Sequence, residues 1–371
     1  LRKRGKTMAK KVTSSDVAKL AGVSQPSVSL ILNDSGKVSF SNETKERVFA
    51  AAQALGYQPK HQRRVVRRHS DMILVLTPTL SNPYYCELSQ SIESYAASRD
   101  YHAIICNTFR RPSLEKYYLD AFAGGKVGGI IYTFLPSFPR VVEQLAKETP
   151  VILIGEKKND LTICSIELSN HTAGALLAEH LYLLDHRDVT FISTPTNQTT
   201  LAREQRLEGM REFFARQGLD HCVHVIEADC DTEDDFVSGG TSYEYRVAQA
   251  LTEQFLQSGS ESTALIGAND MIAVGICETL KRAGFRVPED YSVCGFDNIF
   301  MSSLLSPPLT TVDHRLHLRS KFAVDMVVDR GQAPESKATE AVNKIEYAPT
   351  LIVRASTSRR KQRRQSRDSG T

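Results

Sequence analysis

The chain has 371 residues, of which 41% are hydrophobic and 24% charged, and its formal net charge is +3. This length predicts two or three domains, and the apolar share allows a large core. No apolar run is long enough for a membrane helix, and no apolar segment follows the basic N-terminus, which argues against a membrane protein and against a secretory signal.

The small net charge conceals a strong asymmetry along the chain. Residues 1–70 carry 15 Lys and Arg against 4 Asp and Glu, and residues 354–371 carry 7 against 1, so the segment between them is acidic. A basic head on an acidic body predicts phosphate contact at one end only, because the body is repelled from DNA. The seven cysteines form no CxxC pair and several lie in apolar runs, which is typical of reduced thiols in a cytosol.

Residues 13–32, with the sequence TSSDVAKLAGVSQPSVSLIL, predict two short helices joined by a tight turn. Thr13 and Asp16 have the spacing of a capping box at the start of the first helix. The apolar face of this helix is expected to contain Val17, Leu20 and Ala21.

The second helix completes the pair. Gly22 permits the turn, and Ser24 can cap a helix that tolerates Pro26 in its first turn. Val28 and Ile31 are placed to face the first helix. This combination predicts a helix-turn-helix, whose second helix enters the major groove of DNA, and the alternative is an ordinary αα-hairpin.

A third helix and an arginine-rich segment follow. Ser41 can cap this helix and Gly56 can end it, and its buried stripe is expected to contain Val48, Ala52 and Leu55. Residues 57–70, YQPKHQRRVVRRHS, predict either a solvated linker or a segment that orders on the DNA backbone and minor groove. We favour the second interpretation because the segment directly follows the three helices.

From residue 71 onward, short apolar runs alternate with amphipathic stretches. The expected strands are 72–76, 103–107, 128–133, 151–155, 163–168, 189–194, 223–227, 264–268 and 292–296. The expected helices are 89–98, 114–122, 141–147, 173–184, 206–217, 247–257 and 271–282. This alternation predicts parallel sheets covered on both faces. Two successive doubly wound lobes fit the length, the second beginning at 163, with a crevice at the carboxyl ends of the strands.

Polar and aromatic side chains follow several of these strands, where such folds bind ligands. Tyr84 and Tyr85 can form a stacking wall or pack beneath their loop. Asn269 and Asp297 suit a polyhydroxyl ligand, although Asn269 can instead cap the next helix. Arg206 is expected to open a helix, where a cation gains nothing from the helix dipole, so its position points to a bound acceptor.

The sequence contains no recognisable catalytic or cofactor-binding pattern. No Walker loop, nucleophile elbow or dinucleotide fingerprint is present, and residues 221–224 offer only a weak metal-ligand cluster. We therefore expect no catalytic residues, no metal and no cofactor. A transport-type solute-binding protein and a doubly wound enzyme remain as alternative classes, which the basic helical head and the missing nucleophile disfavour.

An ordered set of blocks resembles the LacI/GalR family of bacterial transcription regulators over residues 10–357. The blocks are DVAKLAGVS at 16–24, LGYQP at 55–59, SNPYY at 81–85, RLEG at 206–209, AND at 268–270, GFDN at 295–298, PPLTTV at 307–312 and LIVRAST at 351–357. The resemblance implies an N-terminal all-α helix-turn-helix domain, a hinge helix and an α/β body of two doubly wound lobes like a periplasmic sugar-binding protein. It also implies a homodimer that reads palindromic double-stranded DNA with two heads.

The resemblance also assigns roles to residues. Gln25, Pro26 and Leu30 fall where the family reads bases, and Val66 falls where it places a minor-groove wedge. The complete expected DNA-binding set is Thr13, Ser24, Gln25, Pro26, Ser27, Ser29, Leu30, Arg63, Arg64 and Val66. Since Pro26 and Leu30 offer no polar readout, the hinge arginines are expected to supply much of the affinity. Arg206 and Asp297 fall on effector positions, and the expected effector-binding set is Tyr84, Tyr85, Arg206, Asn269 and Asp297.

These observations predict four segments and one function. The segments are a helix-turn-helix domain at 10–58, an arginine-rich hinge at 59–70, a two-lobed effector-binding and dimerisation domain at 71–356 and a basic disordered tail at 357–371. The predicted function is that of a cytoplasmic transcriptional repressor controlled by a small effector, a sugar or sugar derivative. A purine or a phosphoprotein is the alternative effector. The effector is expected to prefer one lobe angle, which sets the spacing of the hinges.

Overall fold

The computed structural model describes residues 13–32, 40–55, 57, 70–158, 160–195, 201–229, 242–332 and 342–360. The chain forms two compact units, Leu1–Arg68 and His69–Thr371. The predicted hinge residues Arg63, Arg64 and Val66 lie outside the described residues, as does Gly56. No helix within the described ranges is long and apolar enough to cross a membrane.

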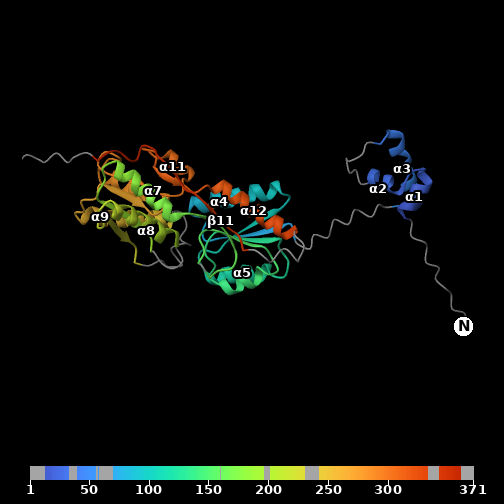
Figure 1. Ribbon diagram of the computed structural model, residues 1–371, viewed down its shortest axis with the longest axis horizontal. Helices are drawn as coiled ribbons and strands as arrows, with labels where there is room; N and C mark the ends of the chain where they lie inside the picture. Colours follow the sequence, from blue (N-terminus) through green and yellow to red (C-terminus); the bar gives the residue numbers. More distant parts are fainter. Residues whose placement is uncertain are drawn as a thin grey trace, which may run out of the picture. The chain divides into compact units, whose positions relative to one another are not determined.

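The described part of the N-terminal unit contains the three predicted helices, α1 (Ser14–Ala21), α2 (Gln25–Leu32) and α3 (Asn42–Ala54) (Figure 1). Gly22 joins the first two with a φ of +67°, in the left-handed region that favours glycine. The amide of Thr13 donates to Asp16 Oδ2 at 2.9 Å, and the amide of Thr44 donates to Ser41 Oγ at 3.3 Å. These contacts confirm the predicted caps of α1 and α3.

The small core of this unit differs from the prediction at one position. Val17, Val28, Ile31 and Val48 are buried as expected. Leu20 is 57% exposed, so its predicted place on the apolar face is wrong. Val17, Ala21 and Ala18 cover an arc of roughly 100° on the buried side of α1, and at 100° per residue Leu20 lies about 60° beyond the Val17 edge of that arc.

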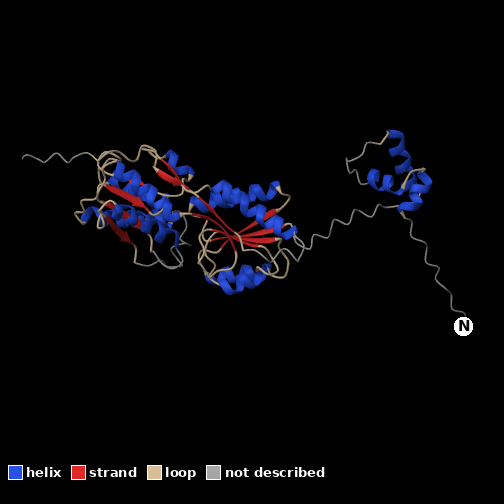
Figure 2. Cartoon of the chain, viewed as in Figure 1, coloured by secondary structure: helices blue, strands red, loops and turns tan. Residues whose placement is uncertain are grey.

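The first lobe of the second unit is a six-stranded parallel sheet with helices on both faces (Figure 2). Its strand order is β11-β5-β4-β3-β1-β2. Ile73, Ile131 and Ile152 pack beneath helices α4 and α12, whereas Leu74 and Leu153 belong to the core on the other face. The elements are β1 (Met72–Thr77), α4 (Pro83–Ser98), β2 (His102–Asn107), α5 (Pro112–Phe122), β3 (Gly129–Tyr132), α6 (Pro139–Leu145), β4 (Val151–Ile154), β5 (Cys164–Leu168), α12 (Leu316–Gln332) and β11 (Lys344–Tyr347).

The second lobe is a four-stranded parallel sheet of order β7-β6-β8-β9 beside a short antiparallel pair, β10-β12. Helices α7 and α8 pack together, and so do α9 and α10. The elements are α7 (Asn170–Leu183), β6 (Val189–Ser193), α8 (Leu201–Arg216), β7 (Val223–Glu227), α9 (Tyr243–Gln257), β8 (Ala264–Gly267), α10 (Asp270–Arg282), β9 (Ser292–Cys294), α11 (Phe300–Leu304), β10 (Thr311–Asp313) and β12 (Thr350–Ile352).

The two lobes are not successive along the chain, which corrects the predicted arrangement. The strand expected to open the second lobe, β5, pairs with β4 in the first sheet, from Ile152–Cys164 to Ile154–Ile166. The chain later returns from β10 to α12 and β11 in the first lobe and then crosses to β12 in the second. Figure 1 shows this return as the red α12 lying beside the blue-green α4. The lobes are therefore joined by three crossovers, on which their relative movement depends.

Two further expectations change at element ends. The helices α4, α5 and α6 begin at Pro83, Pro112 and Pro139, which is two to six residues before their predicted starts. Proline is favoured at the first position of a helix, and the pattern of apolar residues does not show this signal. The predicted disordered tail starts too early. The amide of Arg360 donates to the Leu184 carbonyl at 2.8 Å, so the chain packs on the second lobe through residue 360.

Candidate functional site

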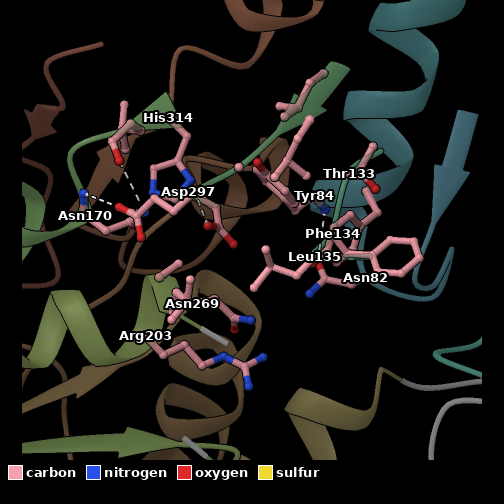
Figure 3. Close-up of a pocket in the computed structure, with 18 of the residues that line it drawn as sticks. Asn82, Tyr84, Thr133, Phe134, Leu135, Asn170, Arg203, Asn269, Asp297 and His314 are labelled. Carbon is pink, nitrogen blue, oxygen red and sulfur yellow. Dashed lines mark hydrogen bonds and ion pairs between the residues drawn. The ribbon is translucent and has the colours of Figure 1, made fainter. Parts of the chain in front are cut away.

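A cleft between the two lobes contains the candidate ligand site (Figure 3). Its cavity volume is about 140 Å³, and the hollow widens to about 890 Å³ of empty space where it opens to solvent. The five residues that the sequence predicts for effector binding all line it: Tyr84, Tyr85, Arg206, Asn269 and Asp297. The fold thus brings together side chains that are more than 200 residues apart.

Arg206 is nearly buried, and its guanidinium is held on three sides by the second lobe. Nε donates to Asn170 Oδ1 at 2.7 Å, and Nη1 donates to the carbonyl oxygen of Ala268 at 2.6 Å. Nη2 lies 3.2 Å from His314 Nε2 and 3.8 Å from Asp297 Oδ1. The arginine is therefore fixed before any ligand binds.

The position of Arg206 has a different origin from the one predicted. Helix α8 begins at Leu201, so Arg206 lies in its second turn, and the expectation that it opens the helix is wrong. It is placed instead by close packing of α7 on α8. A Cβ on Gly174 would lie 1.9 Å from the Arg206 carbonyl oxygen, and one on Gly209 would lie 1.9 Å from the His171 carbonyl oxygen. Only glycine permits this approach of the two backbones.

His314 connects the arginine to Asp297. Because a guanidinium only donates, His314 Nε2 accepts from Arg206, and Nδ1 carries the hydrogen toward Asp297 Oδ1 at 3.2 Å. Burial lowers the pKa of His314 well below its ordinary value, and the charges of Arg206 and Arg319 lower it further. The ring is therefore neutral at neutral pH.

Asp297 is the acidic end of this network. Burial raises the pKa of Asp297 well above its ordinary value, and the charge of Arg206 opposes that rise. Its φ of +124° is rarely adopted by residues other than glycine. Such strain is found most often at ligand sites, where the surrounding structure holds it in place.

Asn269 caps the next helix and also lies in the cleft wall, where its predicted role in ligand binding remains a prediction. Its Oδ1 accepts from the amide of Ile272 at 2.9 Å and caps α10, and the side chain also lines the cleft. The neighbouring Asp270 is fully buried and accepts from Ser302 Oγ at 2.5 Å and Thr311 Oγ1 at 2.6 Å. Asp270 therefore ties α10 to the loops around it, whereas Asn269 belongs to the cleft wall.

The first lobe contributes an aromatic wall. The rings of Tyr84 and Tyr85 meet edge to face with centroids 5.1 Å apart, and Tyr84 makes a similar contact with His314 at 5.9 Å. Arg319, near the start of α12, donates from Nη1 to the Tyr84 hydroxyl at 3.3 Å. Figure 3 shows Tyr84 on the opposite side of the cleft from Asn170 and Asp297.

Polar contacts also join the two lobes directly. Asn82 Nδ2 donates to Glu244 Oε1 at 3.0 Å, and the amide of Phe300 donates to Glu87 Oε1 at 2.9 Å. Burial opposes ionisation of Glu244, but the hydrogen bond from Ser242, the nearby charge of Arg203 and the bond from Asn82 together lower its pKa. The buried carboxylate is therefore favoured in its charged form and accepts a hydrogen bond across the lobes.

Sequence reasoning missed several cleft residues, among them Asn170, Glu244, His314 and Arg319. A local pattern was present for His314 and for the helix that carries Arg319, although not for the role of Arg319 itself. His314 follows the PPLTTV block directly, and Ala323, Val324, Val327 and Val328 have the spacing of one buried helix face. That spacing predicts α12 and places Arg319 one turn before its buried stripe.

The candidate DNA-reading helix α2 has one buried and one open side. Val28 and Ile31 are buried, whereas Ser24, Gln25, Pro26 and Ser29 are exposed, as is Thr13 before α1. Ser27 and Leu30 are half-buried. Gln25 Nε2 donates to Ser14 Oγ at 3.1 Å. The amide of Ser27 donates to Ser24 Oγ at 3.2 Å, which confirms Ser24 as the cap.

Known proteins resemble this chain along most of its length. The family model for bacterial regulatory proteins of the lacI family matches residues 13–60, and that for a periplasmic binding protein-like domain matches residues 178–357. The HTH-type transcriptional regulator DegA of Bacillus subtilis is 29% identical over 355 residues, which is 94% of this chain and 98% of DegA. The ribose operon repressor of Halalkalibacterium halodurans is 31% identical over 308 residues, which is 82% of this chain and 86% of that repressor.

A solved structure agrees with these relatives. The Lac repressor dimer bound to operator and the anti-inducer ONPF superposes with a TM-score of 0.66 at 25% identity and covers 94% of this chain and 100% of its own. The order of the sequence blocks, the three-helix unit and the two-lobed body all have counterparts in these proteins, which are transcriptional regulators. The chain therefore belongs to the lacI family of bacterial regulatory proteins.

Proposed function

We propose that the chain is a transcriptional repressor whose affinity for a palindromic operator is controlled by a small sugar or sugar derivative bound between the lobes. One observation carries the effector part of this proposal. Five residues chosen from the sequence converge on one cleft whose walls belong to different lobes. The names of the ribose operon repressor and of the Lac repressor complex favour a sugar-type effector.

The mechanism follows from the bridges between the lobes. A ligand that contacts both walls favours one lobe angle, to the extent that its affinity differs between the two angles. In a dimer, that angle sets the distance between the segments that lead to the two helix-turn-helix units. The effector thereby decides whether both units fit their half-sites.

The exposed apolar side chains of α11 support a homodimer. Phe300, Met301 and Leu304 are 67%, 39% and 66% exposed and form an apolar group on one short helix. Such groups on a folded protein are typical of contact surfaces. We propose a homodimer that acts in the bacterial cytoplasm, where operator DNA is found, and we propose no catalytic activity.

Operator binding tests the DNA-binding part directly. The full-length chain should select a palindromic duplex from a random pool, and binding should weaken steeply with salt. We expect the pair of changes Arg63→Ala and Arg64→Ala to weaken binding more than Gln25→Ala and to flatten the salt dependence. A larger loss from Gln25→Ala would show that α2 is the main source of affinity, and failure to select any duplex would contradict the proposal.

A purine is the second candidate effector, and the edge-to-face pair Tyr84–Tyr85 is the observation that favours it, since aromatic walls stack on bases. A thermal-shift screen of sugars, sugar phosphates and purines, repeated with operator present, separates the two candidates. Stabilisation follows affinity for the folded state, so each hit can be interpreted. An effector must also change operator binding in the same assay.

A further inference from the structure

We propose that the effector carries a negatively charged group, a phosphate or a carboxylate, that binds against Arg319 in the first-lobe wall of the cleft. The inference rests on the proposed function, because it assigns a chemical class to the same effector. It depends on a different residue from those that led to the sugar assignment. It also predicts that anionic ligands stabilise the chain more than a neutral sugar does.

Arg319 is a buried cation that lines the cleft. Its side chain is only 4% exposed. Nη1 donates to the Tyr84 hydroxyl and Nη2 donates to the Ile166 carbonyl oxygen, each at 3.3 Å. Nε is buried and has no hydrogen-bond acceptor among the residues that the structure describes. Within the same residues, no carboxylate oxygen lies within 4.0 Å of the guanidinium.

This arrangement leaves a positive charge without compensation. Burying an ionised group without a partner of opposite charge is unfavourable, and arginine does not escape the cost by losing its proton. Two long hydrogen bonds to neutral oxygens satisfy donors but do not balance charge. A ligand anion is the missing partner, and the planar guanidinium matches the paired oxygens of a phosphate or carboxylate.

The carboxylates of the cleft do not supply this balance, because each has other partners. Glu244 accepts from Asn82 and Ser242. Glu156 accepts from Asn170, and Asp297 Oδ1 lies 3.2 Å from His314 Nδ1 and 3.8 Å from Arg206 Nη2.

Other cationic side chains of the cleft reinforce the excess of positive charge. His314 stays neutral, partly because Arg319 lowers its pKa. Arg110 and Arg203 also line the cleft, and both lower the pKa of the Tyr85 hydroxyl against the rise caused by burial. Tyr85 therefore faces two arginines, whose effect Glu244 partly opposes.

The remaining cleft residues specify the rest of the ligand. Asn170, Asn269 and Asp297 offer paired donors and acceptors on the opposite wall, which suits hydroxyl groups. The cleft, with a cavity volume of about 140 Å³ that opens to solvent, suits a ligand of monosaccharide size with one charged substituent. The proposed effector class is therefore a sugar phosphate or a sugar acid.

Thermal unfolding of the full-length chain with four probes tests this assignment. The probes are inorganic phosphate, D-glucose 6-phosphate, D-gluconate and D-glucose, each at millimolar concentration and constant ionic strength. The variant is Arg319→Met, and Arg330→Met is its control, because it removes the same charge from the same helix outside the cleft. We expect phosphate and at least one anionic sugar to raise the Tm of the wild type and of the control, and to do so more than glucose.

Arg319→Met should weaken the apparent affinity for the stabilising anion at least tenfold without lowering the Tm of the ligand-free chain. An arginine kept for structure alone would give the opposite result, a lower Tm and an unchanged anion response. Arg319→Gln is the second neutral variant, because it keeps a donor for Tyr84 and remains informative if the methionine variant fails to fold. Preference for phosphate esters over gluconate, or the reverse, distinguishes the two anion types.

Two outcomes overturn the inference. One is that neither phosphate nor an anionic sugar stabilises the wild type. The other is that the Arg319 variants respond to these anions as the wild type does. Operator binding measured on the same samples separates this failure from failure of the proposed function. If a neutral sugar changes operator affinity equally in wild type and Arg319→Met, the repressor assignment stands and the anionic effector is wrong, whereas absence of operator binding contradicts the repressor itself.

Discussion

Each wall of the cleft contains one buried arginine, and the two arginines differ in whether a group of opposite charge lies nearby. In the second-lobe wall, Arg206 has Asn170, the Ala268 carbonyl, His314 and Asp297 around it. In the first-lobe wall, Arg319 has only neutral oxygens at 3.3 Å. The second-lobe wall is complete without a ligand, whereas the first-lobe wall lacks a negative charge.

This difference indicates that the two walls contribute to ligand binding in different ways. A self-satisfied polar network is rigid and presents fixed donors and acceptors, so it can discriminate the arrangement of hydroxyl groups. An uncompensated cation instead attracts an anionic group of the ligand. Its electrostatic energy falls most when that anion binds. A ligand that joins the walls would therefore be oriented by the second lobe and drawn in by the first.

The largest expected effect comes from removing the second-lobe arginine. Arg206→Met leaves Asp297 buried beside a neutral histidine, and we expect it to lower the free energy of unfolding by about 3–5 kcal/mol. Urea unfolding followed by circular dichroism measures the change. The double variant with Asp297→Asn should recover at least half of it, because no carboxylate is left stranded. Equal stability of the single and double variants would show that the network is not the source of the loss.

The same contrast predicts that Arg319→Met does not lower the free energy of unfolding and can raise it, because the change removes a buried charge that has no partner of opposite charge. Both variants should shift the response of operator binding to higher effector concentrations. Only the Arg206 variant should need the second change to restore stability. Comparison of the two therefore separates the structural role of a cleft arginine from its role in binding.

Much of the fold could be predicted because the strands of a parallel sheet are buried on both faces. Met72–Thr77 and Val151–Ile154 are continuous apolar or β-branched runs whose ends the sequence nearly defines. The return of the chain to the first lobe could not be predicted. Lys344–Tyr347 is a short strand with alternating exposure, and its partner Cys164–Leu168 lies about 180 residues earlier. Local pattern carries no information on such a pairing.

The candidate site divides in the same way. Arg206, Asn269 and Asp297 are predictable because they follow strands or belong to distinctive blocks. Arg319 is not, since its significance depends on burial and on the distance to every carboxylate. Those are properties of the tertiary structure, and the sequence shows only one more arginine in a helix.

The loss of stability in acid is the next largest expected effect. It tests whether a buried histidine outside the cleft also contributes to the stability of the second lobe. His186 Nδ1 lies 2.7 Å from Thr263 Oγ1, and Nε2 donates to the Ser358 carbonyl oxygen at 3.0 Å. Burial lowers the pKa of His186 from 6.5 to about 4. Below pH 6.5 the unfolded chain binds a proton that the folded chain refuses, so stability falls by about 3 kcal/mol as the pH drops to 4.

The variant His186→Gln isolates this contribution. Glutamine keeps one donor and one acceptor but does not titrate in this range, so the loss of stability between pH 6.5 and 4 should be smaller than in the wild type. Unfolding in urea at several pH values measures both slopes. Parallel slopes would assign the acid sensitivity to other groups, with the buried His314 of the cleft as the first to examine.

A smaller effect comes from the glycine contact that positions the second-lobe wall. Gly174→Ala places a methyl group 1.9 Å from the Arg206 carbonyl oxygen, so α7 and α8 must separate. We expect a loss of about 1–3 kcal/mol in unfolding free energy together with weaker effector binding, because Arg206 moves with its helix. Glu179→Ala, at an exposed position of α7, is the control for helix propensity. A stable Gly174→Ala variant with normal effector affinity would contradict this account of how Arg206 is placed.

The smallest effect concerns the one phenolic contact of Arg319 and refines the contrast between the walls. Tyr84→Phe keeps the ring against Tyr85 and His314 but removes the hydroxyl that accepts from Nη1 at 3.3 Å. In the ligand-free chain this should cost at most about 1 kcal/mol, since the bond is long and joins a cation to a neutral oxygen. With a saturating anion the cost should shrink further, because the ligand oxygen takes over the donor. A cost that instead grew with bound anion would mean that Tyr84 contacts the ligand itself, and the first-lobe wall would then orient the ligand as well as attract it.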